Sequence, residues 1–261
     1  MRLIENVRAG YSFLEGIAPY SSGVIAAPGY EITHVTLAVS LPWEEGMHAA
    51  RKYVQSLGLS QWSLCGFELR CPQPHTMDGF IDFNAGYRAV LQDWDMYVDG
   101  ENPIARTNVS PVLNSPSETM LYGFSVCQES QIDWNTFVIA GGGELVGGLR
   151  NGAIVCQGKS DQAAMLEKAR TVARLMKTRL DGLGANGQRL STIDVYTAHN
   201  LHPLIEGAIA AEIGEVAQRG LQWFYTRPPI IDIEFEMDMR GVQQERIVDL
   251  SRCLTPLLNT K

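Results

Sequence analysis

The chain has 261 residues, 45% of them hydrophobic and 19% charged, which is ordinary for a globular protein with a large buried core. Its formal net charge of −8 and its sequence pI of about 5.2 disfavour nucleic acid and anionic membrane surfaces as partners, because phosphate groups are bound by basic faces. A small anionic substrate is compatible with this charge, since one or two local arginines suffice to bind it.

Cysteine and histidine usage argues against a metal centre. There are five cysteines, no pair has CxxC spacing, and histidine and cysteine do not cluster at ligand spacing. We therefore expect reduced, mostly buried thiols in a cytoplasmic protein, and neither a metal nor another cofactor. The N-terminus lacks the apolar core of a signal peptide and no apolar run reaches transmembrane length, so no membrane contact is expected.

The first half of the chain predicts alternating strands and helices. Residues 30–41 combine β-branched residues with partial hydrophobic alternation, which is typical of a strand. Residues 44–57 predict a helix with acidic residues in its first turn and with Gly58 after its end. The other elements predicted here are a strand at 63–70, a helix at 80–94, and β-rich runs that begin at Arg106 and Met120.

The second half repeats this order. Its strongest element is a helix at 161–183, where apolar residues recur at three and four positions and form one face. The charged residues of this helix are assigned to its solvent-facing sides: Lys168, Arg170, Arg174, Lys177 and Arg179. The glycine-rich run 141–148 lacks the Lys-Ser/Thr ending of a phosphate loop and predicts a flexible hairpin. The other predicted elements are strands at 136–140, 152–157 and 192–197, a helix at 204–216, and β-rich runs that follow Arg219 and Ile233.

The two halves also match in the spacing that follows one arginine. Without a gap, the segment from Arg106 to Leu121 aligns with the segment from Arg219 to Glu234. We therefore predict two divergent copies of one unit, residues 1–130 and 131–261, each of the order β-β-α-β-α-β-β and each ending in a hairpin that the arginine opens. Such alternation predicts an α+β fold, in which each sheet is backed by two helices and the two units superpose.

Short motifs near Arg106 are similar to those of a known family. The segment Pro103-Ile-Ala-Arg106 is close to a Pro-Ala-Arg motif, and Phe80, Asn84 and Tyr87 match a Phe-x-x-x-Asn-x-x-Tyr helix. In these motifs the chain resembles the Rid family, also called YjgF-like proteins, which are imine and enamine deaminases with a chorismate-mutase-like fold. The resemblance covers nearly the whole chain twice, so it implies two tandem chorismate-mutase-like units. Tandem copies are also similar to the chorismatases, longer enzymes that release pyruvate from chorismate.

The resemblance implies roles for three residues. In the family an arginine grips the substrate carboxylate, and a glutamate in the last strand helps to place the attacking water. Arg106 and Arg219 fall at the family arginine and Glu234 falls at the family glutamate, whereas the first unit has Leu121 at that position. Neither copy is complete, and family sites lie between the subunits of trimers. The resemblance therefore implies a homotrimer, or a multiple of it, in which complementary halves meet.

The residue types agree with these roles and also leave structural alternatives open. A guanidinium fork matches two carboxylate oxygens, but an arginine at the start of a strand can equally form a structural ion pair. Glu234 can accept a proton from water, but its alternation with Glu236 and Asp238 is typical of the solvent-facing side of a strand. Further candidate substrate contacts are Asn108, Tyr196 and His199.

Together these features predict a cytoplasmic hydrolase that deaminates an imine or enamine of a small carboxylic acid, such as an aminomuconate-like intermediate. Arg106 or Arg219 would anchor the carboxylate and Glu234 would handle the water, without a covalent nucleophile. One alternative is a chorismatase-like enzyme that cleaves the enol ether of chorismate in a larger pocket with two anion anchors. A second alternative is a non-catalytic ligand-binding or regulatory member of the fold, for which one arginine suffices.

Overall fold

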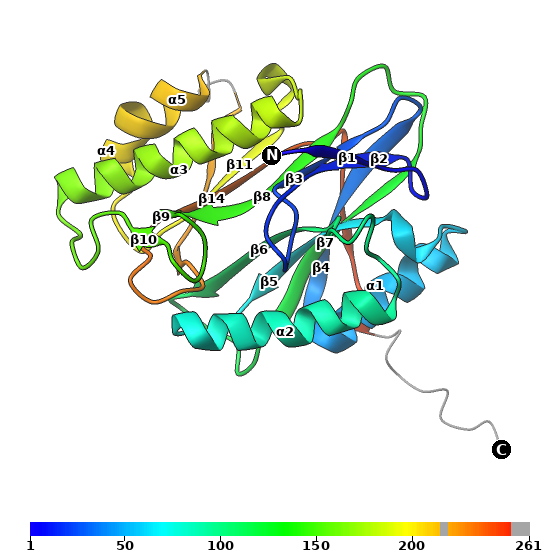
Figure 1. Cartoon of the computed structure of the whole chain (residues 1–261), viewed down its shortest axis with the longest axis horizontal. Helices are drawn as coiled ribbons and strands as arrows, with labels where there is room; N and C mark the ends of the chain where they lie inside the picture. The colour runs from blue at the N-terminus through cyan, green and yellow to red at the C-terminus, as the bar shows by residue number, and fades with distance from the viewer. Residues whose placement is uncertain (215–218, 252–261) are drawn as a thin grey trace.

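The computed structural model describes residues 1–214 and 219–251, and every structural statement below concerns these residues. Two mixed β-sheets pack face to face, and helices cover the outer side of each sheet (Figure 1). The predicted α+β class with helix-backed mixed sheets is confirmed. The helices are α1 (Trp43–Ser56) and α2 (Met77–Asp93) on one sheet, and α3 (Gln162–Gly182), α4 (His202–Leu204), a π-helical turn (Ile205–Ala210) and α5 (Ala211–Ile213) on the other.

The six-stranded sheet has the order β13-β6-β5-β7-β4-β15 and the seven-stranded sheet has the order β1-β2-β3-β8-β14-β11-β12. The strands of the first are β4 (Tyr30–Pro42), β5 (Leu64–Arg70), β6 (Ala105–Pro111), β7 (Met120–Glu129), β13 (Thr226–Arg227) and β15 (Gln244–Val248). The strands of the second are β1 (Leu3–Asn6), β2 (Tyr11–Leu14), β3 (Gly23–Ala26), β8 (Phe137–Gly143), β11 (Thr192–Tyr196), β12 (Gln222–Phe224) and β14 (Glu236–Gly241). A small hairpin of β9 (Leu145–Val146) and β10 (Ala153–Ile154) follows β8.

The two sheets share one internal order of strands. β5 lies between β6 and β7, parallel to β6 and antiparallel to β7. In the other sheet β11 lies between β12 and β14 with the same directions. The predicted terminal hairpins are therefore wrong, because in each half an earlier strand lies between the two runs. The order of strands is repeated in the two halves, and their superposition stays a prediction.

Several strands pair across the predicted boundary at residue 130. From the N-terminal end, β1, β2 and β3 extend the sheet of the second half, where β3 pairs with β8. From the C-terminal end, β13 and β15 form the two edges of the first-half sheet, beside β6 and β4. Each sheet is thus built from both halves of the chain, and the space between the sheets is lined by both.

The helix α3 buries two of the charged residues that its pattern assigned to solvent. Its first turn is capped by Asp161, whose side chain accepts hydrogen bonds from the amides of Ala163 and Ala164. Lys168 is fully buried and Arg179 is 9% exposed, so their predicted place on the solvent-facing sides is wrong. The physical reason is that α3 packs against the sheet on one side and against the α4–α5 segment on another, which leaves only part of its circumference to water.

Polar side chains of β14 face the opposite sheet. Glu236 and Asp238 are each 4% exposed, although their alternation predicted a solvent-facing side. The hydroxyls of Thr107, on the facing sheet, and of Tyr196 donate hydrogen bonds to Asp238 at 2.5 and 2.9 Å. Alternation alone cannot distinguish a side that is covered by a second sheet from a side that is covered by water.

One shorter stretch also differs from the sequence predictions. The predicted strand at 152–157 is reduced to the two residues of β10, and Cys156 has a φ of 46°, which is incompatible with an extended strand.

The described free cysteines are Cys65, Cys71 and Cys127, which are buried, and Cys156, which is half-buried, while Cys253 lies outside the described residues. None of the described helices is long and apolar enough to cross a membrane.

Candidate active site

A small cavity of about 190 Å³ lies where side chains of the two halves of the chain meet. Its polar lining comes from β6, which supplies Arg106 and Asn108, from α3, which supplies Arg179, and from β14, which supplies Glu236. The glycines that end β8 form another part of the wall. Its apolar lining includes Phe80, Leu145, Leu149, Leu175, Ile230 and Ile233.

Within the described part of the chain, Arg106 is held in place without a carboxylate partner. Its Nη2 donates a hydrogen bond to Asn84 Oδ1 at 2.7 Å, and its guanidinium lies over the rings of Tyr87 and Tyr20 at 4.5 and 4.9 Å. The side chain is 2% exposed, and its Nε and Nη1 have no hydrogen-bond partner within the described residues. Buried polar atoms are normally hydrogen-bonded, so these two free donors indicate a ligand that accepts hydrogen bonds.

Glu236 shares this cavity and is poised to exchange a proton near neutral pH. The pKa of its carboxyl is raised to about 8, chiefly by burial and in part by Glu144, against the lowering effect of Arg179 and Arg106. No hydrogen bond or ion pair to its carboxyl group occurs within residues 1–214 and 219–251. A carboxylic acid with such a pKa can both donate and accept a proton at pH 7 to 8.

Asn108 adds another donor to the lining. Its Oδ1 accepts a hydrogen bond from the Cys71 thiol at 2.6 Å, which fixes the orientation of the amide. Its buried Nδ2 has no partner among the described residues. With Arg106 and Arg179, the cavity therefore offers several donors and one protonated carboxyl group, a set that suits a small anionic ligand.

The glycines of β8 make room for the polar groups of this cavity. A Cβ atom on Gly141 would collide with Glu236 Oε1 and would lie 3.0 Å from Thr107 Oγ1. A Cβ atom on Gly142 would lie 3.1 Å from Arg179 Nη1. The first three glycines of the run thus belong to a strand whose lack of side chains is required by its neighbours, and only the residues beyond Glu144 form the hairpin that the sequence predicted.

A methyl group on Gly141 should therefore impair the site without unfolding the protein. We expect Gly141→Ala to lower kcat/KM by about tenfold to a hundredfold, since a misplacement of about 1 Å can cost that much. The matched control is Gly86→Ala in α2, where the added Cβ meets no atom within 4 Å. Steady-state kinetics combined with thermal unfolding would check this, and an unchanged kcat/KM for Gly141→Ala would argue against a role for Glu236.

Glu234 lies in a separate cluster and does not line the cavity. Its Oε2 is 2.8 Å from His199 Nε2 and 3.0 Å from Arg227 Nη1, so the candidate residues Glu234 and His199 are brought together with each other. The backbone amides of Glu234 and Phe235 donate to the carboxylate of Glu144 at 2.7 and 3.0 Å. The glutamate that shares the cavity with Arg106 is therefore Glu236. It lies two residues after Glu234, the position that the family resemblance indicates.

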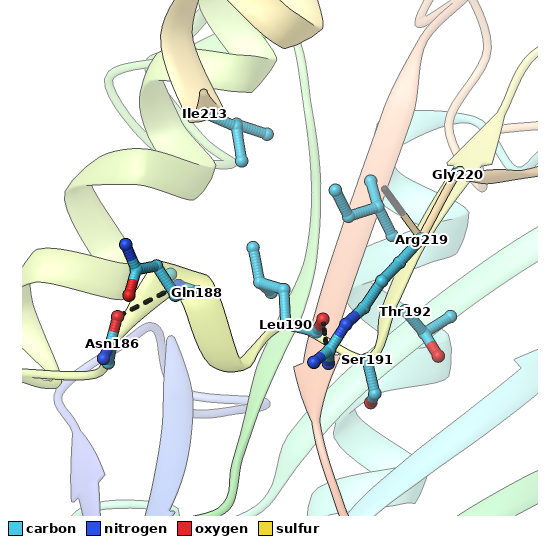
Figure 2. Close-up of a pocket in the computed structure, with 10 residues that line it drawn as sticks. Asn186, Gln188, Leu190, Ser191, Thr192, Ile213, Arg219 and Gly220 are labelled. Carbon is cyan, nitrogen blue, oxygen red and sulfur yellow. Dashed lines mark hydrogen bonds between the residues drawn. The ribbon is translucent and has the colours of Figure 1, made fainter. Parts of the chain in front are cut away.

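Arg219 and Tyr196 also lie away from the cavity. Figure 2 shows the Arg219 side chain extended across a second, larger pocket of about 670 Å³, with Nη1 bonded to the carbonyl of Leu190 at 2.8 Å. This pocket also borders Gly220 and Ile213, and the intervening residues 215–218 lie outside the described part of the chain, so we assign no function to it. Tyr196 is fully buried between the sheets and bonded to Asp238.

Three carboxylates approach one another between the sheets, and arginine side chains pair with two of them. Glu68, Asp194 and Asp238 each place an oxygen within 4.8 Å of the others. Arg240 Nη1 donates to Asp194 Oδ2 at 2.6 Å and lies 3.9 Å from Glu68 Oε1. This cluster links the two sheets as an ion-pair network, and we assign no metal to it.

Sequence reasoning missed Glu236 and Arg179 for different reasons. Glu236 follows Glu234 on the same side of an alternating run, so moving the family alignment by two residues would have found it. Arg179 is one of several cations on a charged helix, and no local signal distinguishes it from those that face water. Only the packing of α3 against β8 identifies it.

Comparisons with known proteins agree with this fold. The family model described as 2-aminomuconate deaminase CnbZ matches residues 3–246. The 2-amino-5-chloromuconate deaminase of Comamonas testosteroni is 35% identical over 243 residues, which cover 92% of this chain and 96% of that protein. A crystal structure of a chorismatase is similar over 85% of this chain and 77% of its own, with a TM-score of 0.51 and 14% identity, which concerns the fold alone.

A structure of the YjgF gene product of E. coli is similar over 51% of this chain and 93% of its own, with a TM-score of 0.28 and 13% identity. The resemblance to Rid proteins and chorismatases that the sequence motifs indicated is confirmed, as is the prediction of an enzyme that hydrolyses a C–N bond. Since the family model spans nearly the whole chain and the Comamonas relative is 35% identical, the chain belongs to the 2-aminomuconate deaminase CnbZ family.

Proposed function

We propose that this protein deaminates an enamine or imine of a small unsaturated carboxylic acid of the 2-aminomuconate type, and that the cavity of Arg106 and Glu236 is its active site. The observation that carries the proposal is the meeting of unpartnered guanidinium donors on Arg106 with the buried carboxyl group of Glu236 in one cavity. The names of the matching family and of the Comamonas relative support the substrate class.

In the proposed reaction Arg106 and Asn108 bind the carboxylate beside the reacting carbon. Their free donors, Nε and Nη1 of Arg106 and Nδ2 of Asn108, supply charge-assisted hydrogen bonds to its oxygens. The aromatic rings around Arg106 and its bond to Asn84 keep the guanidinium fixed, so little side-chain freedom is lost when the substrate binds.

Glu236 then moves the protons. Protonated Glu236 donates its proton to the enamine carbon, which converts the enamine into an iminium ion. The resulting carboxylate accepts a proton from water as the oxygen attacks the iminium carbon, and this step restores protonated Glu236. The carbinolamine passes its hydroxyl proton to nitrogen and expels ammonia, leaving the ketone, so one water is consumed for each ammonia released.

The matched pair Arg106→Lys and Arg219→Lys tests the proposal. Lysine keeps the charge but loses the planar fork, so Arg106→Lys should lower kcat/KM by about tenfold to a hundredfold, the cost of one charge-assisted hydrogen bond. Arg219→Lys should leave it unchanged, because Arg219 lies in the other pocket. Ammonia release from 2-aminomuconate measures both, and pyruvate release from chorismate serves as the competing assay.

Pyruvate release without ammonia release would replace the proposal by the chorismatase-like alternative, and neither product would favour a ligand-binding role. The sequence predictions of a homotrimer and of a cytoplasmic location stay predictions. Light scattering tests the first, where a particle of 28.8 kDa would be a monomer and would contradict it.

A further inference from the structure

The cavity contains a second arginine that the proton transfers described above do not use. Arg179 projects from the last turn of α3, in the second half of the chain, whereas Arg106 comes from β6 in the first half. Both guanidiniums line the same space of about 190 Å³. Neither forms an ion pair with a carboxylate within the described ranges 1–214 and 219–251.

Arg179 is held by backbone carbonyls on one nitrogen only. Its Nη1 donates to the carbonyls of Ala140 and Gly141 at 2.7 and 3.1 Å, while its Nε has no partner in the described part of the chain. Gly142 is required beneath it, because a Cβ atom there would lie 3.1 Å from Nη1 and 2.7 Å from Leu175 Cδ2. The guanidinium is thus fixed in position while part of its donor capacity is unused.

Two buried cations without anionic partners in one cavity are costly unless a ligand supplies the anions. Among the described residues that line the cavity, Glu236 alone carries a carboxyl group, and its pKa of about 8 keeps it mostly protonated at neutral pH, so it does not neutralise both arginines. Between the polar groups the wall is apolar, with Phe80, Ile230 and Ile233 forming one cluster. The ligand that fits this lining is small, with a short hydrocarbon middle and a negative charge at each of two ends.

We propose that Arg179 is a specificity-determining anchor for a second carboxylate, which makes the site select dicarboxylic over monocarboxylic ligands of the same chain length. This inference rests on the proposed location of the active site. It concerns binding and does not depend on whether deamination is the reaction.

The test compares muconate with sorbate, two unreactive six-carbon dienoates that differ in one carboxylate. Isothermal titration calorimetry of the full chain at pH 7 should give a Kd for muconate that is about tenfold to a hundredfold lower than for sorbate, the range expected for one charge-assisted contact. Arg179→Met should bring the two Kd values within about threefold of each other, by weakening muconate and leaving sorbate unchanged. Arg179→Lys should retain part of the preference, since lysine keeps the charge.

The matched control is Arg174→Met on the same helix, where Arg174 pairs with Glu212 at the surface and should leave both Kd values unchanged. Thermal unfolding of Arg179→Met shows whether the fold persists, and Arg179→Lys supplies the comparison if it does not. Equal affinity of the wild-type protein for muconate and sorbate would overturn the inference, as would an equal loss of both ligands in Arg179→Met. If the protein prefers muconate to sorbate but releases no ammonia from 2-aminomuconate, the proposed function is overturned and this inference stands.

Discussion

Replacing Glu236 with glutamine should lower kcat for ammonia release by about 10²- to 10⁴-fold, the usual contribution of a positioned acid or base. The amide keeps the shape of the carboxyl group but can neither give up a proton to the enamine carbon nor take one from water. KM should change much less, because proton transfer belongs to the transition state. The matched control is Glu234→Gln, which removes a carboxylate two residues away that is paired with His199 and Arg227 and should leave kcat within about threefold.

The pH dependence of the wild-type enzyme provides a second readout of the same residue. If protonated Glu236 starts the reaction, kcat/KM should be level below its pKa of about 8 and fall about tenfold per pH unit above it. A rate that rises toward pH 8 would instead mean that the carboxylate is the active form. A large loss in Glu234→Gln with a normal Glu236→Gln would return the water-handling role to the family position.

The raised pKa of Glu236 also affects stability in a defined direction. Between its ordinary value of 4.5 and about 8 the unfolded chain releases the proton while the folded chain keeps it, so rising pH favours unfolding. The stabilisation is therefore complete below pH 4.5 and is lost as pH rises through 8. Glu236→Gln removes this titrating group. As pH rises from 4.5 to about 8, the unfolding free energy of the wild type should therefore fall relative to that of the variant.

Replacing Lys168 with methionine should destabilise the protein by roughly 3–5 kcal/mol, the cost of leaving a buried charge without its partner. Lys168 Nζ lies 2.9 Å from Glu144 Oε1, and both side chains are fully buried. The Glu144 carboxylate also accepts hydrogen bonds from the backbone amides of Glu234 and Phe235, which directly precede Glu236. An unpaired Glu144 would have to rearrange or admit water, and each of these loosens the start of β14.

Urea denaturation measures this effect as a shift of the midpoint at constant slope. The matched control is Lys177→Met on the same helix, whose partner Asp181 is at the surface one turn away, and it should cost less than about 1 kcal/mol. The double variant Glu144→Gln with Lys168→Met should recover part of the stability, because no charge is then left buried. A loss as small as that of Lys177→Met would mean that water reaches the Glu144 carboxylate.

The local sequence pattern of this protein determined its elements well. Helical periodicity and capping predicted α1, α2 and α3 to within a few residues, and β-branched runs predicted β4, β5 and β11, because these signals depend on neighbours within one or two turns. The short motif around Arg106 was equally informative. Asn84 and Tyr87, recognised as part of that motif, bond to and stack on the Arg106 guanidinium.

Only the tertiary structure decided which strands pair and which side chains share the cavity. The insertion of β5 between β6 and β7, and the pairing of β3 with β8, join segments that are far apart in sequence and depend on the packing of two sheets. The burial of Arg179 and Glu236 follows from that packing, since a second layer covers sides that periodicity alone assigns to water. The sequence therefore determined the fold class and one anchor of the candidate site, while its proton-transfer group and second cation were set by contacts between layers, which no local pattern encodes.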